Sequence, residues 1–398
     1  MQIGNDTVIV SAARTPFGKF GEALSALTAV ELGAATIREI LARTGLNQHG
    51  HLIDNVIMGM VLQGGAGQIP SRQATIQAGL PEEVPSDTVN KVCISSLRAI
   101  CMADMSIRSK EASVVIAGGM ESMSNSPYIM PKARWGHRMG DGRLVDLMVH
   151  DGLTCAFHKV HMAVHGSTIA KEVGISREEQ DQWALRSHNN AVAAMDNGKL
   201  KEEIVPVLVP RKKADSILVE LDECPRRDTD IDKLRKLRPL FDKGGTVTAG
   251  NAPGVNDGAA SVLVMSGKRA VELGITPLAR IIGHTTVALE PTNIAKAPGL
   301  ATNKLLEKIK MNVKDIDLFE INEAFAAVAL ASGKIAGWDP DKVNVNGGAI
   351  AFGHPIGASG ARIVMTLIYE LKRRGGGIGL AAICGGGAQG DALALEVF

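Results

Sequence analysis

The sequence predicts an α/β fold built from two similar halves. Strand-like apolar runs alternate with helix-like periodic segments toward both ends of the 398-residue chain. The two series follow one order at nearly constant distance, because Ile316-Asp317 follows Ile53-Asp54 by 263 residues and Ser359 follows Ser95 by 264. A duplicated α/β half explains this spacing, and alternating strands and helices indicate mostly parallel sheets covered by helices.

The first half begins with a β-branched run at 8–10, which predicts a strand. A helix pattern follows over 29–42, and a second strand is expected at 52–59. Residues 90–99 begin another predicted helix, which ends at the basic segment 108–110. The apolar run 113–117 then predicts a buried strand, which is followed by two glycines.

The second half repeats this series. Strands are expected at 279–282 and 315–322, with a helix over 300–309 between them. The glycine-rich segment from 357 opens a helix that runs to the basic residues 372–374. The strand expected at 378–384 again ends in glycines, as its counterpart does in the first half.

The stretch between the halves differs from them in charge and proline content. Residues 211–243 are densely charged and interrupted by prolines, and helices are expected at 177–196 and 230–237. An insertion between two similar halves often covers a site at their junction. We therefore expect a first half made of 1–122 and 252–275, an inserted domain at 123–251, and a second half at 276–398.

Charge and composition exclude several classes of protein. The 43 basic and 42 acidic residues give a net charge of +1 without a basic block, which argues against a nucleic-acid or membrane-surface binder. Aromatic residues make up only 3%, whereas glycine accounts for 44 residues. No secretory signal or long apolar span is visible, and five scattered cysteines without a C-x-x-C pair indicate reduced thiols and no metal. We expect a soluble cytoplasmic protein.

Cys93 lies at a predicted strand-to-helix turn, followed by the small residues Ser95 and Ser96. Backbone N–H groups at a helix start lower the pKa of a thiol and favour a nucleophilic thiolate. Most lone cysteines are small core residues, so Cys93 considered by itself leaves both interpretations open.

Three segments of the second half combine glycine with reactive side chains. Residues 347–360 place His354 beside Pro355 among glycines whose spacing does not match a dinucleotide loop. Cys384 precedes three glycines whose N–H groups can stabilise an oxyanion. Asn322 precedes Glu323 at a predicted strand end, where an Asn can bind a polar group or cap a helix.

Together these segments resemble the thiolases, and the resemblance covers essentially the whole chain. It is strongest at Asn90–Leu97, Asn322–Phe325, Gly353–Gly357 and Cys384–Gly387. It extends to Ser11–Pro16, Gly67–Ala74, Gly118–Met123 and Thr248–Asn251. The resemblance implies a layered α-β-α-β-α core of two duplicated βαβ-type halves with an inserted loop domain.

The resemblance also implies catalytic roles. Cys93 is the acylated nucleophile, His354 takes its proton, and Cys384 acts as acid and base, since an ordinary thiol pKa of ~8.5 lies near working pH. His354 with an Asn322-bound water forms one oxyanion hole, and the N–H groups of Cys93 and Gly386 form the other.

The inserted domain resembles the part of the family that holds coenzyme A, which is a substrate here and not a tightly bound cofactor. The positions that match its binding tunnel are Leu153, His161, Met162, Arg226, Ala249 and Phe325. Arg226 suits a phosphate, although a solvated surface Arg beside Arg227 is an equal alternative. Pro253 departs from the family, since many members have a Ser there that contacts pantetheine.

The resemblance is close to bacterial acetyl-CoA acetyltransferases of the degradative type. It implies reversible condensation of two acetyl-CoA molecules to acetoacetyl-CoA, in a homo-oligomer that is a dimer or tetramer. The alternatives are a 3-ketoacyl-CoA thiolase with longer substrates in fatty-acid breakdown and, more distantly, a Cys-His hydrolase. A catalytically silent CoA-binding protein has no chemical reason to retain all four catalytic residues.

Overall fold

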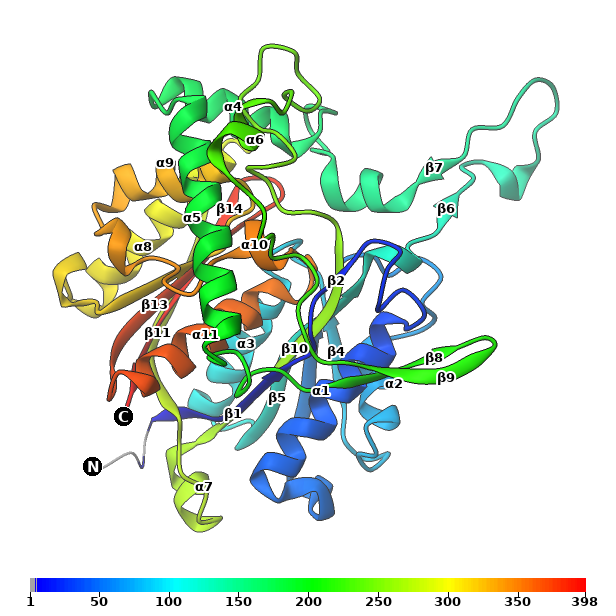
Figure 1. The fold of residues 1–398 in the computed structure, drawn as a ribbon. Helices are drawn as coiled ribbons and strands as arrows, with labels where there is room; N and C mark the ends of the chain where they lie inside the picture. The colour runs from blue at the N-terminus through cyan, green and yellow to red at the C-terminus, as the bar shows by residue number, and fades with distance from the viewer. Residues whose placement is uncertain (1–3, 5) are drawn as a thin grey trace.

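The computed structural model describes residue 4 and residues 6–398, and its central element is a ten-stranded mixed sheet (Figure 1). The first half contributes β1 (Thr7–Arg14), β2 (Gly18–Lys19), β3 (Asn55–Gly59), β4 (Ser86–Val89), β5 (Val114–Ser122) and β10 (Asn256–Ser266). The second half contributes β11 (Ala279–Ala288), β12 (Leu318–Ile321), β13 (Gly377–Gly385) and β14 (Gln389–Val397). A short antiparallel pairing of β1 with β11 joins the halves.

The pairing pattern confirms the duplication. In the first half β1 is antiparallel to β10, β10 is antiparallel to β5, and β5 is parallel to β3. In the second half β11 is antiparallel to β14, β14 is antiparallel to β13, and β13 is parallel to β12. The expectation of mostly parallel sheets is wrong, because β14 returns from β13 through a tight turn and β10 enters its half in the reverse direction.

Helices make the layers between and around the strands of the two halves. The helices of the halves are α1 (Ala29–Thr44), α2 (Pro70–Gln77), α3 (Ser95–Arg108), α7 (Gly267–Glu272), α8 (Ala297–Ile309), α9 (Ala326–Ala336), α10 (Ala349–Phe352) and α11 (Ser359–Arg373). α3 and α11 pack on each other and on the strands of their own halves, so they form the middle layer. α1 covers the outer face of the first half and α8 that of the second. This is the expected α-β-α-β-α order.

α11 is enclosed between the two halves. Residues 359–371 of this helix are all buried, since the first half covers one side and the second half the other. Glycine permits the close contact, because a Cβ on Gly119 would collide with the carbonyl oxygen of Gly357. The charged Arg362 is retained by an ion pair with Glu320 at 3.1 Å, as a buried charge requires.

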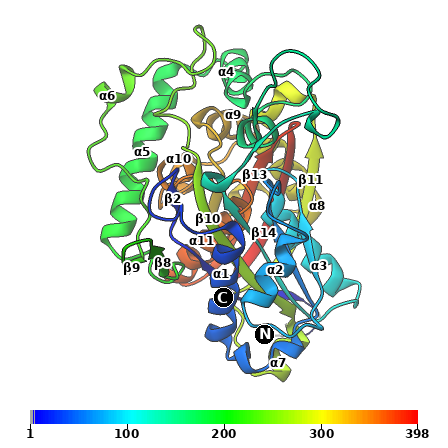
Figure 2. The same ribbon diagram turned by 90° about the vertical axis from the view of Figure 1, so that its right-hand side faces the viewer.

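The inserted stretch wraps around one side of the core and extends an arm away from it (Figures 1 and 2). Its elements are β6 (Tyr128–Ile129), β7 (Val145–Asp146), α4 (Met162–Glu172), α5 (Arg177–Asp196), β8 (Val207–Arg211), β9 (Ala214–Val219) and α6 (Ile231–Arg235). The two expected helices of this stretch are therefore present. The proposed domain boundaries remain a prediction; β5 ends at Ser122 and β10 begins at Asn256.

A buried arginine fastens the insertion to the core. Arg14, at the end of β1, is fully buried and pairs with Glu203 at 2.8 Å and Asp222 at 2.7 Å. Both partners lie in the inserted stretch, so the charge that β1 buries is neutralised only when that stretch is in place. Among the described residues, no helix combines the length and apolar content needed to cross a membrane.

Candidate active site

Loops from both halves and from the insertion enclose one apolar cavity of about 230 Å³. The first half contributes the loop before α3, and the second half contributes the loop before α11 and the turn between β13 and β14. The insertion contributes the segment before α4. Residues that line the cavity include Val92, Cys93, Leu153, His161, Met162, Leu240, Phe241, Pro253, Phe325, His354, Ile356 and Gly386.

Cys93 lies on the strained turn that leads into α3. The preceding Val92 has a φ of 51°, a left-handed conformation that costs a β-branched residue free energy. Ser95 fixes the turn, since its backbone N–H donates to Val92 O at 3.0 Å and its hydroxyl to the same oxygen at 2.6 Å. The turn presents the half-buried thiol to the cavity.

The helix start does not lower the pKa of Cys93 below its ordinary value. Burial raises the pKa of this thiol to about 12, its own backbone N–H lowers it, and the nearby Glu121 carboxylate raises it further. Desolvation therefore outweighs the helix start, and Cys93 rests as a neutral thiol that needs a base to become a nucleophile.

His354 has the tautomer that such a base needs. Its Nδ1 lies 2.6 Å from Ser359 Oγ, and that hydroxyl donates to the carbonyl oxygen of Pro355 at 3.0 Å. The single hydroxyl proton is thereby used, so Nδ1 carries the hydrogen and Nε2 keeps its lone pair. Burial, with Arg362 nearby, lowers the pKa of His354 to about 3, which keeps the ring neutral.

Three polar atoms of this region are buried and find no hydrogen-bond partner within the part of the chain that the structure describes. They are His354 Nε2 and both side-chain atoms of Asn322, Nδ2 and Oδ1. Asn322 directly follows β12, and its backbone N–H continues the ladder to Ala382 O at 3.0 Å. Unpartnered buried polar atoms are costly and are typical of groups that bind substrate or water. His354 lines the cavity with Cys93, whereas Asn322 lies just before the lining residues Ala324 and Phe325 and is not itself part of the wall.

Cys384 lies near the end of β13, fully buried behind the cavity wall. Burial raises the pKa of its thiol, and the neighbouring Cys93 raises it further. The expectation of an ordinary thiol pKa near working pH is therefore wrong, because it ignored the loss of solvent. A thiol in this position is a proton donor at rest and becomes a base only when its proton moves to a partner.

The turn after Cys384 depends on glycine. A Cβ on Gly386 would lie 3.2 Å from the side chain of Val92, and one on Gly385 would press on Ile94 and on the carbonyl oxygen of Lys91. Gly387 has a φ of 73°, the left-handed region that glycine enters without strain. The turn therefore packs directly against the turn that carries Cys93, and Gly386 lies on the cavity wall.

Comparison with known proteins decides the family. The thiolase N-terminal domain model matches residues 7–268, and the thiolase C-terminal domain model matches residues 275–397. The chain belongs to the thiolase family.

Two bacterial acetyl-CoA acetyltransferases are similar to this thiolase over nearly its whole length. The one from Cupriavidus necator is 51% identical over 391 residues, 98% of this chain and 99% of the relative. One from Escherichia coli K12 is 48% identical over 392 residues, 98% of each. The crystal structure of the Bacillus anthracis acetyl-CoA acetyltransferase superimposes with a TM-score of 0.96 at 40% identity and covers both chains completely. This likeness confirms the thiolase fold.

The positions expected to hold coenzyme A lie in two adjoining cavities. Leu153, His161, Met162 and Phe325 line the same cavity as Cys93. Arg226 and Ala249 line a neighbouring cavity of about 530 Å³. The two hollows share Leu240 and residues 252–255, so Pro253 lies on the wall between them.

His161 is part of the cavity wall and caps a helix. Its Nδ1 accepts the backbone N–H of Ala163 at 3.2 Å, at the N-terminus of α4. Its ring stacks on Phe241 with centroids 3.7 Å apart, and burial lowers its pKa to about 4. The ring is therefore neutral, with the hydrogen on Nε2.

Two buried carboxylates hold the loops of the thiolase site in place, and neither has a role predicted from the sequence. Glu121 accepts the backbone N–H groups of Val61, Leu62 and Gly357 at 3.1, 3.1 and 3.0 Å, which ties the two halves together. Glu323 accepts from Trp183 Nε1 at 2.9 Å and from Ser187 Oγ at 2.8 Å, which ties α5 to the loop after Asn322. Both carboxylates lie within motifs that resemble the family, and that position is the signal that could have identified them.

Proposed function

We propose that this thiolase is an acetyl-CoA C-acetyltransferase, which reversibly converts two acetyl-CoA molecules to acetoacetyl-CoA and CoA. One observation carries the proposal: Cys93 from the first half and His354 from the second line a single apolar cavity. Full-length similarity to acetyl-CoA acetyltransferases supports the same substrates.

In the first half-reaction Cys93 Sγ attacks the thioester carbon of acetyl-CoA while His354 Nε2 accepts the thiol proton. The tautomer of His354 supports this direction of transfer. The tetrahedral intermediate collapses with cleavage of the carbon–sulfur bond to CoA, which takes the proton of the Cys384 thiol and leaves as a thiol, so that Cys384 becomes a thiolate. The product is an acetylated Cys93.

In the second half-reaction the Cys384 thiolate removes a proton from the α-carbon of another acetyl-CoA. His354, which still holds the Cys93 proton on Nε2, and a water held by Asn322 stabilise the enolate oxygen, which suits their unpartnered buried atoms. The enolate carbon attacks the acetyl group on Cys93, and the N–H groups of Cys93 and Gly386 stabilise the oxyanion. Cleavage of the Cys93 thioester releases acetoacetyl-CoA, and the proton on His354 Nε2 returns to the Cys93 thiolate, which regenerates both groups.

Coenzyme A serves as substrate in this scheme. The apolar wall of Leu153, Met162 and Phe325 suits its pantetheine arm, and Arg226 in the adjoining cavity suits a phosphate. We place the enzyme in fatty-acid metabolism in the cytoplasm, where thiols such as Cys93 and Cys384 stay reduced.

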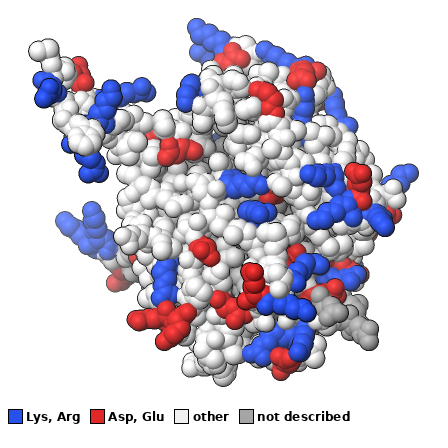
Figure 3. Space-filling view, turned by 180° about the vertical axis from the view of Figure 1, so that it is seen from behind, with Lys and Arg blue, Asp and Glu red and all other residues white. Residues whose placement is uncertain are grey.

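We further propose that the chain forms a homo-oligomer, with the tetramer favoured over the dimer. The arm between β6 and β7 supports self-association (Figures 1 and 3). On this arm Trp135 exposes 82% of its surface and Met139 exposes 97%. A second chain would cover this apolar surface. Its basic side chains project from the body of the molecule in Figure 3.

The acyl-enzyme is the direct test. Incubation with acetyl-CoA followed by peptide mass spectrometry should give an acetyl adduct on Cys93 and none on the buried Cys101, which serves as internal control. An intact protein with no adduct on Cys93 contradicts the proposal.

Cys384 separates the thiolase from a Cys-His hydrolase. The Cys384→Ala variant should lose condensation by ~10³-fold or more, because it removes the group that exchanges the α-carbon proton in this scheme. Full turnover in that variant would favour the hydrolase. Initial rates over a series of 3-ketoacyl-CoA chain lengths then distinguish an acetyl-specific enzyme from a thiolase with longer substrates.

A further inference from the structure

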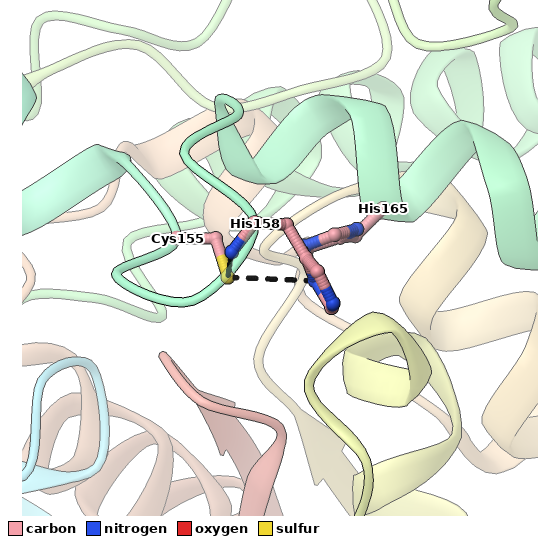
Figure 4. Close-up of side chains that lie close together, drawn as sticks. All are labelled: Cys155, His158 and His165. Atoms are coloured by element: carbon pink, nitrogen blue, oxygen red, sulfur yellow. Dashed lines mark hydrogen bonds between the residues drawn. The ribbon is translucent and has the colours of Figure 1, made fainter.

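A second group of metal-binding side chains lies outside the catalytic residues. Cys155 and His158 belong to the turn before α4, and His165 lies within α4 (Figure 4). Cys155 Sγ lies 3.9 Å from His158 Nδ1, and that nitrogen lies 3.4 Å from His165 Nε2. One ligand atom from each side chain lies within 4.8 Å of the other two.

The backbone holds these side chains in place. The backbone N–H of Cys155 donates to Val160 O at 2.8 Å, and the N–H of Lys159 donates to Cys155 O at 2.9 Å. Lys159 has a left-handed φ of 58°, which closes the turn. The backbone N–H of His158 donates to Cys155 Sγ at 3.4 Å, a contact that stabilises a thiolate. The turn is thus organised by its own backbone around the sulfur.

Hydrogen bonds alone cannot satisfy both close contacts of His158 Nδ1. An imidazole nitrogen offers either one hydrogen or one lone pair, yet His158 Nδ1 faces both the sulfur and His165 Nε2. A cation between them would bind all three lone pairs. With Zn–N of about 2.0–2.1 Å and Zn–S of about 2.3 Å, tetrahedral ligand atoms lie roughly 3.3–3.6 Å apart, close to the separations here.

A carboxylate lies beside His158, the exposed member of the three side chains. Glu290 Oε1 lies 3.5 Å from His158 Nε2, the ring nitrogen that points away from Cys155. Metal-bound histidines commonly direct their other N–H toward a carboxylate, which fixes the tautomer and strengthens the ligand. His165 is buried within α4, so the group combines two buried side chains with the exposed His158.

We propose that Cys155, His158 and His165 bind one Zn²⁺ ion, with water in the fourth position and Glu290 orienting His158. The mixture of one thiolate and two imidazoles favours zinc over magnesium or calcium. On binding, the Cys155 thiol releases its proton to solvent and no electron is transferred. The His158 side chain is 43% exposed, which gives the ion a route in.

The position of the site indicates what the ion does. Leu153 and His161, on either side of the Cys155–His158 turn, both line the cavity that contains Cys93. Thr154 pairs with His161 across the base of the turn. Zinc would link this turn to α4 and so stabilise one wall of the substrate cavity without touching the reacting atoms. The three side chains have the spacing C-x2-H-x6-H in the sequence.

The test is a Co²⁺ titration of the metal-stripped, full-length protein. We expect one equivalent to bind with a thiolate-to-cobalt charge-transfer band, and stoichiometric Zn²⁺ to remove that band by displacement. Cys155→Ser should abolish the charge-transfer band. His158→Ala, which changes a half-exposed side chain, should weaken binding at least tenfold while the variant keeps its circular dichroism spectrum. His150→Ala, an exposed imidazole in the same segment, is the matched control and should bind as wild type does.

The catalytic thiols provide the competing explanation. If the band persists in Cys155→Ser and disappears in Cys93→Ala, the metal binds at the catalytic cavity and the proposal is overturned. A protein with no thiolate band, or with equal affinity in His158→Ala and wild type, overturns it as well. Zinc should also raise the Tm of the wild type and leave that of folded His158→Ala unchanged.

Discussion

The two halves of the core have the same pattern of strands and helices but use their loops differently. The loop before α3 in the first half carries Cys93, and the equivalent loop before α11 in the second half carries His354. The segment after β3 in the first half has its backbone N–H groups bound by Glu121, whereas the segment after β12 in the second half begins with the unpartnered Asn322. One duplicated scaffold thus supplies an anchored nucleophile on one side and polar groups free to bind substrate on the other.

This contrast teaches why a duplicated fold suits the chemistry. The nucleophile must be rigid, and Glu121 fastens the first half to the loop of the second through Gly357. The groups that receive protons and oxyanions must keep unused lone pairs and hydrogens, and the second half provides them at His354 and Asn322. Neither half contains a complete site, so the cavity exists only at their junction.

Replacing the nucleophile should have the largest effect. Cys93→Ala removes the atom that carries the acyl group, so kcat for acetoacetyl-CoA thiolysis should fall by roughly 10⁴-fold or more. Cys101→Ala, in α3 of the same half, is the matched control and should keep turnover within a few-fold of wild type. A folded Cys93→Ala enzyme with more than a hundredth of wild-type activity would place the nucleophile elsewhere.

Asn322 tests the polar side of the comparison. Asn322→Ala removes a buried group that holds an oxyanion-binding water in our scheme, worth ~3 kcal/mol of barrier, so kcat should drop by about 10²-fold. KM should change little, because the interaction strengthens only in the transition state. Steady-state kinetics beside the exposed Asn303→Ala variant measure this, and a loss below threefold would remove Asn322 from the mechanism.

Glu121 tests the anchored side. Glu121→Gln replaces one acceptor oxygen with an N–H donor that faces backbone N–H groups, so the free energy of unfolding should fall by about 2 kcal/mol. Urea denaturation measures the change, with Glu111→Gln on the exposed surface of the same half as control. An unaltered unfolding midpoint for Glu121→Gln would show that the halves do not depend on this carboxylate.

Much of the fold could be predicted from the sequence, because repetition and periodicity are local. The offset of Ser95 from Ser359 identified α3 and α11 as equivalent helices, and the expected helix 177–196 coincides with α5. Strands β10 and β14 were not among the expected strands, so their antiparallel pairings could not be predicted. An apolar run also looks the same in the sequence whether it enters a sheet parallel or antiparallel. Direction depends on the connections, which the insertion before β10 conceals.

The site was predicted less completely than the fold. Which residues meet at the cavity followed from the resemblance for Cys93, His354 and Gly386, but the separation of Arg226 and Ala249 into an adjoining cavity did not. The thiol pKa shifts were missed because desolvation is set by everything that packs around a sulfur atom, and no local pattern reports it.

The smallest expected effect is on the pH dependence of acetyl transfer below about pH 7. It depends on the pKa of His354, from the second half, and on that of Cys93, from the first. Burial and Arg362 lower the pKa of His354 to about 3, far below the ordinary value of 6.5, while burial raises that of Cys93 to about 12. A lowered imidazole pKa means that the basic, neutral form persists as pH falls, so protonation of His354 does not limit acylation above about pH 5. The rate of acetyl transfer to Cys93, followed by CoA release in a single turnover, should therefore be flat from about pH 5.5 to 7.5. A limb with an apparent pKa near 6.5 would mean that His354 is solvated in the working enzyme and has an ordinary imidazole pKa there.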